Sequence, residues 1–404
     1  MKALRLVFTA MLLIVASVFR LTPKGGNGST ATLDVDTATD LITPTRKLRI
    51  CVLNWRDLKN PAAGGAEVYT EHVLRRWSRQ GHEVTLFAAA VEGAPADEVV
   101  DGYRVVRRGS KLSVYSEAKK WYRLHGQGEF DVVIDQTNTI PFRAHKWVND
   151  APVVGFFHQT AEECWMHNTA LPAALLGRYI LEPHWLRGFR NVPTLTVSDS
   201  TAKSLARFGV SDTIVIPEGY EPPMVPPQVR KEDRPTIAWC ARLVNYKRPQ
   251  DLLAAAEILR NQIPDLQVWF IGSGEDLDKL RAAAPEGVEY LGFVSNEEKL
   301  DRMARAHVHV ATSVREGWGL VVSEAAAVGT PTVAYDTPGL RDSTKAANGV
   351  TCEANPQALA DTLATWLPFW KQNPPQALPY GGAHSWDHVA NKMMEALLVQ
   401  AGLS

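Results

Sequence analysis

Two successive sets of short, β-branched runs, separated by longer amphipathic segments, constrain the fold of this chain more than any other feature. The first set runs from LRICVLNW (48–55) to TIVIP (213–217), and the second from TIAWC (236–240) to GVTC (349–352). Short apolar runs that alternate with helical segments are typical of a parallel sheet covered by helices. The Pro-rich stretch 221–228 can continue neither a helix nor a strand. The sequence therefore predicts an α/β protein with two doubly wound, Rossmann-like domains.

We place the first domain at residues 46–222 and the second at 223–384, with a final amphipathic helix at 385–402. Parallel α/β sheets bind ligands at the carboxyl ends of their strands, so a cleft shared by the two domains is the expected site. The other predicted strands are 83–89, 103–106, 131–135, 152–157 and 194–198 in the first domain, and 266–272, 288–293, 308–312 and 332–336 in the second.

Residues 1–45 stand apart from this pattern. They contain an uncharged run, 6–19, followed by a polar linker. Fourteen residues are too few to span a bilayer comfortably, and no small-residue cleavage site follows. A weak anchor, a signal sequence and a start codon placed too far upstream all remain open. We exclude these residues from the fold and expect a cytoplasmic enzyme from Arg46 onward.

The composition excludes several classes of protein. The 404 residues are 45% hydrophobic, which excludes a disordered chain, a fibrous repeat and a disulfide-held miniprotein. The 43 Lys and Arg residues balance 44 Asp and Glu residues, so no global field would bind nucleic acid. We therefore expect no nucleic-acid partner. Specific recognition of a ligand therefore has to come from a local site and not from the overall charge.

The string REGWGLVVSEAAAVGTPTVAYDTPGLRD (315–342) holds the clearest chemical signal. Glu316 and Glu324 are eight residues apart in it, while Gly317 and Gly319 leave room for backbone amides to approach an anion. A helix that begins near Gly319 would add its positive N-terminal end. Such a loop can hold a pyrophosphate and sugar hydroxyl groups without a metal.

With this string, the chain resembles family 4 of the retaining glycosyltransferases, which have the GT-B fold and a Glu-x7-Glu pair in this context. ARLVNYKRP (241–249) resembles the family's arginine–lysine segment, and residues 63–87 resemble its N-terminal glycine loop and first helix. Residues 196–221 are similar to the end of its first domain, and the likeness runs in register over roughly residues 47–402. The resemblance implies two Rossmann-like domains that face each other across a cleft, the first on the acceptor side and the second binding the donor. It implies as well that the final helix, 385–402, crosses back to brace the first domain.

The resemblance also implies roles for residues of the second domain. Glu316 would contact the transferred sugar near the reacting carbon, and Glu324 would hold the ribose hydroxyl groups. Arg242 and Lys247 would clamp the diphosphate of the donor and offset the charge that grows on it as it leaves. The donor-binding backbone would be that of Gly317, Trp318, Gly319 and Leu320, with the first three amides binding sugar hydroxyl groups.

Five further positions follow from the same resemblance. Gly64 and Gly65 would let the donor phosphate approach the backbone, although a glycine pair also makes a simple tight turn. His158 would contact the donor sugar from the acceptor side, and the alternative is a structural histidine. The backbone at Val294 would read the nucleobase. Glu218 stands where asparagine is more usual in the family, a difference that we expect to matter little to the donor site.

We expect no catalytic metal and no cofactor besides the nucleoside diphosphate sugar, which is a substrate. Asp276 and Asp278 open a predicted helix, where acidic residues favour the helix dipole, and Asp34 and Asp36 lie in the N-terminal linker. The four cysteines lie too far apart for a zinc or redox motif, so we expect them to be reduced core residues. They are Cys51, Cys164, Cys240 and Cys352.

The acceptor side carries weaker signals. Between Arg104 and Arg123 there are seven basic residues and one acid, interleaved with aromatic residues. A basic helix with aromatic residues can settle on an anionic membrane, although a charge run is more often a solvated surface. Glu162, Glu163 and Trp165 are candidates for the acceptor pocket, with ordinary loop residues as the alternative.

The sequence thus predicts a metal-independent retaining glycosyltransferase that moves a hexose from a nucleoside diphosphate sugar to an acceptor hydroxyl group, with an α-linkage from an α donor. Glycan, glycolipid and natural-product synthesis all fit this reaction. Two alternatives remain: a sugar-nucleotide epimerase, and a non-catalytic GT-B partner subunit. The sequence does not identify the base or the sugar of the donor, the acceptor, or the oligomeric state.

Overall fold

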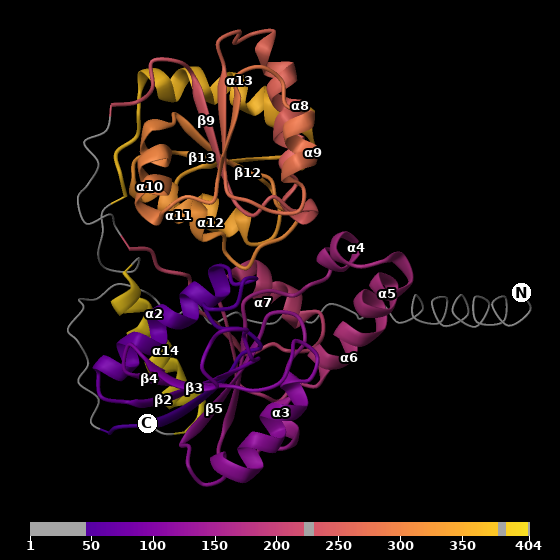
Figure 1. The fold of residues 1–404 in the computed structure, drawn as a ribbon, viewed down its shortest axis with the longest axis vertical. Helices are drawn as coiled ribbons and strands as arrows, with labels where there is room; N and C mark the ends of the chain where they lie inside the picture. Colours follow the sequence, from indigo (N-terminus) through magenta and orange to yellow (C-terminus); the bar gives the residue numbers. More distant parts are fainter. Residues whose placement is uncertain (1–45, 222–229, 379–384, 403–404) are drawn as a thin grey trace, which may run out of the picture. The chain divides into compact units, whose positions relative to one another are not determined.

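In the computed structural model, which describes residues 46–221, 230–378 and 385–402, the strands form one sheet of eight and another of six (Figure 1). The first sheet contains β1 (Arg49–Leu53), β2 (Glu83–Ala88), β3 (Asp97–Val100), β4 (Tyr103–Arg107), β5 (Val132–Thr137), β6 (Val153–Phe157), β7 (Thr194–Thr196) and β8 (Thr213–Val215). The second contains β9 (Thr236–Cys240), β10 (Gln267–Ile271), β11 (Val288–Gly292), β12 (Val308–Ala311), β13 (Thr332–Tyr335) and β14 (Val350–Cys352).

The helices alternate with these strands. In the first domain they are α2 (Gly65–Arg79), α3 (Val114–Trp121), α4 (Cys164–Asn168), α5 (Leu171–Leu176), α6 (Glu182–Arg187) and α7 (Asp199–Ala206), with short segments η1 (Tyr122–Gly126), η2 (Ala144–Lys146) and η3 (Gly177–Leu181). In the second domain they are η4 (Asn245–Lys247), α8 (Pro249–Arg260), α9 (Leu277–Ala282), α10 (Asn296–Arg305), α11 (Leu320–Ala327), α12 (Leu340–Ala346) and α13 (Pro356–Gln372). The last helix is α14 (Trp386–Gln400).

Both sheets are doubly wound. The second has the order β11-β10-β9-β12-β13-β14, with every neighbouring pair parallel. The chain therefore starts at the centre, moves to one edge and returns to the centre, which leaves a topological switch point between β9 and β12. The first sheet has the order β3-β4-β2-β1-β5-β6-β7-β8 and a corresponding switch point between β1 and β5. Ligands bind at such points in open α/β sheets, so the loops after these strands position the site.

The first sheet has a hydrophobic core on each face, because successive strand residues point to opposite sides. In β1, Ile50 and Val52 belong to the cluster that contains α2 and α14, whereas Cys51 and Leu53 belong to the cluster that contains α3. The second sheet is covered in the same way, by α8 and α13 on one face and by α10 and α11 on the other. All four cysteines are buried and unpaired.

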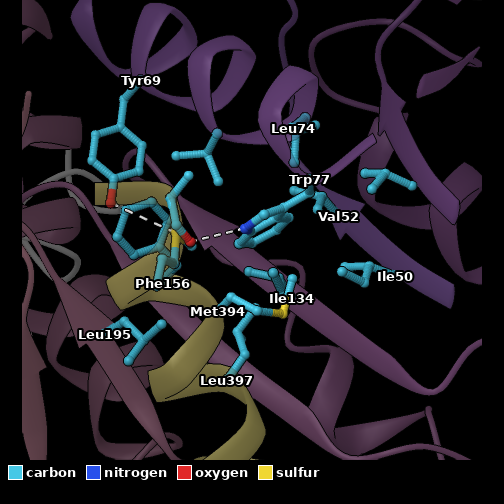
Figure 2. Packing of buried hydrophobic residues seen from close by; sticks show 14 of the residues in the cluster. Ile50, Val52, Tyr69, Leu74, Trp77, Ile134, Phe156, Leu195, Met394 and Leu397 are labelled. Atoms are coloured by element: carbon cyan, nitrogen blue, oxygen red, sulfur yellow. Dashed lines mark hydrogen bonds between the residues drawn. The ribbon is translucent and has the colours of Figure 1, made fainter. Parts of the chain in front are cut away.

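The final helix, α14, completes the core of the first domain although it follows the second domain in sequence. Figure 2 shows Trp77 of α2 donating a hydrogen bond from Nε1 to the carbonyl of Ala390 at 3.0 Å. Nearby, the hydroxyl of Tyr69 lies 3.6 Å from Sδ of Met393. Trp386 is buried, with its ring centroid 5.5 Å from that of Tyr69, so it packs in the core as its position in the amphipathic helix indicates.

One strand departs from the predicted pattern. β3 pairs antiparallel with β4 at the sheet edge, and its side chains alternate between exposed and half-buried. The run DEVV is too polar and too short to stand out as a strand. None of the described helices is both long and apolar enough to span a bilayer. The apolar run 6–19 and the pair Asp34 and Asp36 lie outside the described residues.

Candidate functional site

A cavity of about 380 Å³ lies at the carboxyl ends of both sheets. Its walls are the loops that follow β1, β5, β6 and β8 in the first domain and β9, β12 and β13 in the second. It therefore spans the switch points of both sheets, where a doubly wound fold places a ligand. Of the residues that the sequence singles out, it is lined by Gly64, Gly65, His158, Arg242, Lys247, Glu316, Gly317, Trp318, Gly319 and Leu320.

Glu316 and Lys247 form an ion pair in the wall of this cavity. The same carboxylate oxygen of Glu316 accepts a hydrogen bond from the hydroxyl of Ser313 at 2.6 Å. Burial lowers the pKa of Lys247, but the charge and hydrogen bond of Glu316, together with Tyr246, outweigh burial and raise the pKa to about 12. Lys247 is therefore a permanent cation, and it fixes the carboxylate at the point where the loops after β9 and β12 meet.

The backbone after Glu316 turns directly into helix α11. Gly319 has a φ of 100°, a left-handed conformation that favours glycine, and the helix begins at the next residue. The approach of Gly339 to Glu316 is equally restricted, because a Cβ at Gly339 would lie 2.2 Å from the carbonyl oxygen of Glu316. The N-terminal end of α11, with its partial positive charge, thus lies beside the cavity.

Three residues of the second domain also touch the first. A Cβ on Gly317 would lie 2.5 Å from the carbonyl oxygen of His158, so the two backbones meet closely. Trp318 is buried in the hydrophobic cluster of α2 and α14, and its Nε1 donates to the hydroxyl of Ser323 at 3.0 Å. Leu320 packs against the same cluster.

Arg315 links the domains beside the cavity. Its buried guanidinium, only 3% exposed, binds Glu163 through Nε at 2.7 Å and lies 3.4 Å from Glu162. It also donates to the hydroxyl groups of Thr160 and Ser204, at 3.2 and 3.3 Å. Because Arg315 directly precedes Glu316, these contacts join the loop after β6 to the loop that carries the carboxylate.

All three acceptor-pocket candidates bind other protein side chains. The carboxylates of Glu162 and Glu163 bind Arg315, and the indole of Trp165 donates to Glu182 at 2.9 Å. None of the three candidates lines the cavity.

His158 directly follows β6, at the cavity, and is almost wholly buried. Burial lowers its pKa to about 4, so the ring is neutral at physiological pH. Its Nε2 lies 2.5 Å from the amide nitrogen of Gln136, and its ring meets that of Tyr69 edge-on at 5.4 Å. A neutral, fixed imidazole can make a directional hydrogen bond to a ligand without adding charge.

The glycine loop after β1 is held by a buried carboxylate. Glu67 accepts from the backbone N–H of Gly64 at 2.8 Å and from the amide of Asn138 at 2.9 Å, and it pairs with Arg56 at 3.1 Å. These contacts make Glu67 a structural residue. Gly65 lies next to Leu320 of α11, where an added Cβ would contact the leucine side chain at 3.4 Å.

Three predicted donor residues differ in their placement. Arg242 lines the cavity with an exposed guanidinium, which donates to the hydroxyl of Tyr246 at 3.2 Å. Glu324 lies on α11, where Oε1 pairs with Lys299 at 2.7 Å and Oε2 is buried without a partner in the described part of the chain. Val294 packs against the α10 and α11 side of the second sheet. Neither Glu324 nor Val294 is among the residues that line the cavity.

Glu218, which we expected to matter little, lines the cavity after β8. Its side chain is buried, and one carboxylate oxygen lies 3.8 Å from Nδ1 of His158. A single glutamate in a loop gives no pattern from which burial beside a histidine could be inferred. Its only sequence signal was its departure from the asparagine that is more usual in the family.

Other polar features lie outside the cavity. Asp276 lies just before α9, without a capping hydrogen bond from its side chain, and Asp278 lies in the first turn; neither lines the cavity. Gly272 and Gly274 lie against the backbone of Ala241 and Leu243, where an added Cβ would lie 2.0 and 2.3 Å from a carbonyl oxygen, so they support the Arg242 loop from behind. Among the described residues, no group of three or more His, Cys, Asp or Glu side chains could hold a metal ion.

Comparison with known families covers both domains. A family model described as Glycosyltransferase Family 4 matches residues 63–222, and one described as Glycosyl transferases group 1 matches residues 224–373. Together the two matches span more than half of the chain. They meet at the Pro-rich stretch between the two sheets.

Similar proteins have related names. The chain is 28% identical to a phosphatidyl-myo-inositol mannosyltransferase of Propionibacterium freudenreichii over 289 residues, which is 65% of this chain and 71% of that protein. It is 24% identical to a glycogen synthase of Mycobacterium tuberculosis over 343 residues, or 76% and 82% of the two chains.

Solved structures share the fold at lower identity. A sucrose-phosphate synthase of Thermosynechococcus elongatus superposes with a TM-score of 0.67 at 17% identity, covering 89% of this chain and all of that one. An Anabaena protein in complex with UDP and glucose gives a TM-score of 0.62 at 15% identity, covering 87% of this chain and all of that one. The matches of both domains to glycosyltransferase models, on two facing doubly wound sheets, show that the chain belongs to the group 1, family 4 glycosyltransferases and is a transferase of the GT-B fold.

Proposed function

We propose that the protein is a metal-independent retaining hexosyltransferase that uses a nucleoside diphosphate sugar and forms an α-linkage from an α donor. The observation that carries the proposal is the pairing of Glu316 with Lys247 beside the N-terminal end of α11, in a cavity at the switch points of both sheets. A cation, a helix N-terminus and an anchored carboxylate suit a diphosphate joined to a polyhydroxyl ring.

The donor groups follow from this arrangement. Lys247 and Arg242 bind the diphosphate, and the backbone from Gly317 to Leu320 binds its oxygens and the sugar hydroxyl groups. Glu316 lies near the anomeric carbon, and His158 contacts the sugar from the first domain. Glu324 takes the ribose hydroxyl groups through its free oxygen, because a carboxylate accepts two hydroxyl donors well. Gly64 and Gly65 admit the phosphates, and the Val294 backbone lies toward the base.

Transfer needs no covalent intermediate on the protein. The acceptor oxygen bonds to the anomeric carbon on the face that the phosphate leaves, the bond from that carbon to the phosphate oxygen breaks, and the acceptor proton passes to the departing phosphate. The permanent charge of Lys247, with that of Arg242, stabilises the negative charge that grows on the leaving diphosphate. Positioning by both domains supplies the rest of the acceleration.

The comparisons support sugar transfer in general terms. The similar proteins are named for mannosyl transfer and glycogen synthesis, and a structural neighbour was solved with UDP and glucose. Membership of a transferase family argues against the epimerase alternative. The following binding test distinguishes an enzyme from a non-catalytic partner subunit.

Replacing Glu324 with Ala should remove about half or more of the thermal stabilisation that a nucleoside diphosphate gives the wild type. A ligand at about 100 times its Kd stabilises the folded state by about 2.7 kcal/mol, a shift of several degrees in Tm. Losing charged hydrogen bonds to ribose should weaken binding roughly 10- to 100-fold. Melting with UDP, GDP and ADP measures this and identifies the base. Glu297→Ala, an exposed change at the start of α10, is the control.

The alternative outcome is equally clear in this experiment. If no nucleoside diphosphate or sugar nucleotide shifts the Tm of the wild type, the donor-site proposal fails. The non-catalytic subunit then becomes the better account.

The proposal includes a peripheral contact of the α3–η1 surface with the cytoplasmic face of an anionic membrane. Lys120 and Arg123 are exposed there, beside Leu112 and Leu124, which are 81% and 66% exposed. Three residues of the basic and aromatic run cannot contact a membrane surface. Trp121 and Tyr122 are buried, and Arg107 is buried and paired with Asp57 and Glu98. The remaining basic and apolar side chains suit an anionic surface.

Changing Lys119, Lys120 and Arg123 to Glu should remove co-sedimentation with anionic vesicles. Each cation near such a surface contributes about 1 kcal/mol, so reversing three charges should weaken the partition at least about 100-fold. Vesicles of neutral lipid provide the control. Unchanged sedimentation of the triple variant would refute the contact.

A further inference from the structure

Glu218 has a buried carboxyl group in the wall of the cavity. No lysine or arginine of the described residues forms an ion pair with it. Glu316 pairs with Lys247, and Glu324 pairs with Lys299. Glu218 is 5% exposed, and its one ion-pair neighbour in the described residues is His158, at 3.8 Å. A carboxylate buried without a cation is costly, so such a group tends to be neutral or to await a ligand.

The hydrogen bonds around His158 show which ring nitrogen carries the proton. The hydroxyl of Thr70 donates to the carbonyl of Ala66 at 2.7 Å, so it accepts from the amide nitrogen of Gln136 at 2.5 Å. That assignment makes the Gln136 nitrogen a donor to Nε2 of His158 as well. The proton of the neutral ring is therefore on Nδ1, whose nearest acidic neighbour among the described residues is Glu218 and which has no hydrogen-bond partner there.

The charges that face Glu218 come from several elements. Burial, and then Glu316 of the loop after β12 and Glu324 of α11, raise the pKa of Glu218 to about 8, while Lys247 of η4 acts in the opposite direction. Two further groups complete the surroundings. They are Tyr69 of α2, whose own pKa is raised by burial and by Glu218, and neutral His158, which follows β6. Glu218 is therefore mainly protonated at neutral pH, and it ionises as the pH rises through about 8.

We propose that Glu218 is a specificity-determining residue that, as a neutral acid, donates a hydrogen bond to a hydroxyl group of the transferred sugar. This inference rests on the proposed function, because it assigns the sugar end of the donor to the space between Glu218, His158 and Glu316. A neutral carboxyl offers an O–H donor and an acceptor, which matches a sugar hydroxyl group. The ionised form loses the donor and places a further negative charge near Glu316 and the diphosphate, so it excludes the donor.

The test is the Kd of a sugar nucleotide measured by calorimetry between about pH 7 and pH 9. The diphosphate diester of the ligand does not titrate in this range. If only the protonated form binds, the wild-type Kd should rise about tenfold from pH 7 to pH 9, since one proton is linked to binding. Glu218→Gln keeps the shape and a permanent N–H donor, so its Kd should stay flat. Glu218→Asn should be flat as well.

The controls separate the possible failures. Glu221→Gln removes a carboxylate three residues away, outside the cavity, and should follow the wild type. The matching nucleoside diphosphate lacks the sugar hydroxyl groups and feels only the charge of ionised Glu218, so its Kd should depend on pH less than that of the sugar nucleotide in the wild type and should stay flat in Glu218→Gln. If neither ligand binds at any pH, the proposed function itself fails.

Two other results would overturn only the role of Glu218. One is binding whose pH dependence persists in Glu218→Gln, or is absent from the wild type. The other is a Glu218→Gln protein that binds the donor normally but turns over at least 100-fold more slowly, because that result would require the ionised carboxylate during the reaction.

Discussion

Replacing Glu316 with Gln should lower kcat/KM for glycosyl transfer by about 10²- to 10³-fold while leaving nucleoside diphosphate binding nearly unchanged. The amide keeps the shape of the side chain and can still accept from Lys247 and Ser313. It loses the negative charge that faces the anomeric carbon as positive charge develops there. Removing one such electrostatic contact from a transition state typically costs this much. Initial rates of nucleoside diphosphate release measure the change.

Two comparisons make this result specific. Glu353→Gln, the same substitution at an exposed position of the second domain, should keep the wild-type rate. The Kd of the nucleoside diphosphate should match in all three proteins, because the proposed function places Glu316 at the sugar end of the donor. A Glu316→Gln enzyme with full activity would show that the carboxylate has no part in transfer.

Replacing Gly317 with Ala should also lower kcat/KM by about 10²-fold, through the contact between the domains. The added Cβ would lie 2.5 Å from the carbonyl oxygen of His158, so one of the two backbones has to move. The buried ion pairs of Arg315 with Glu162 and Glu163 hold the same loops together, which limits sliding. A displacement of about 1 Å between reacting groups can cost this factor.

The fold of each domain should survive this change, since Gly317 belongs to neither sheet. The Tm and the circular dichroism spectrum of Gly317→Ala should therefore stay close to those of the wild type, and nucleoside diphosphate binding should persist. Wild-type kcat/KM in this variant would mean that the approach of Gly317 to His158 is not part of the reactive arrangement.

The two sheets could be predicted because their strands are continuous apolar runs separated by helical segments. Buried parallel strands such as β9 and β10 show that pattern clearly, since both of their faces are covered. The edge strand β3 could not be predicted, because half of its side chains face solvent and its pairing with β4 is antiparallel. The family resemblance implies that α14 braces the first domain, but no local pattern predicts its individual contacts, such as that of Gln80 with Asn391 across 311 positions.

Much of the site could be predicted where its residues share a local string. Glu316, Gly317 and Gly319 adjoin each other in sequence and lie together in the cavity. The partner of Glu316 is less local: Lys247 lies 69 positions away, and the pairing of β9 with β12 brings the two loops together. The contacts of Arg315 could not be predicted from the sequence. Its bonds reach 152 positions to Glu163, and no local pattern encodes such a contact.

Charged runs were the least informative part of the sequence. Arg107 looks like the other basic residues between 104 and 123, yet it is buried between Asp57 and Glu98. Trp121 and Tyr122 form part of the core under α3. Composition in a short helix does not show which side faces solvent when both neighbouring strands and loops contribute to its burial.

A crystal structure of the protein with the nucleoside diphosphate that stabilises it would locate the donor site. We expect the diphosphate between Lys247, Arg242 and the N-terminal end of α11, with the ribose hydroxyl groups at Glu324 in place of Lys299. The terminal phosphate should point toward Glu316, His158 and Glu218. A nucleotide bound away from the Glu316 loop, or with its ribose far from Glu324, would contradict the account.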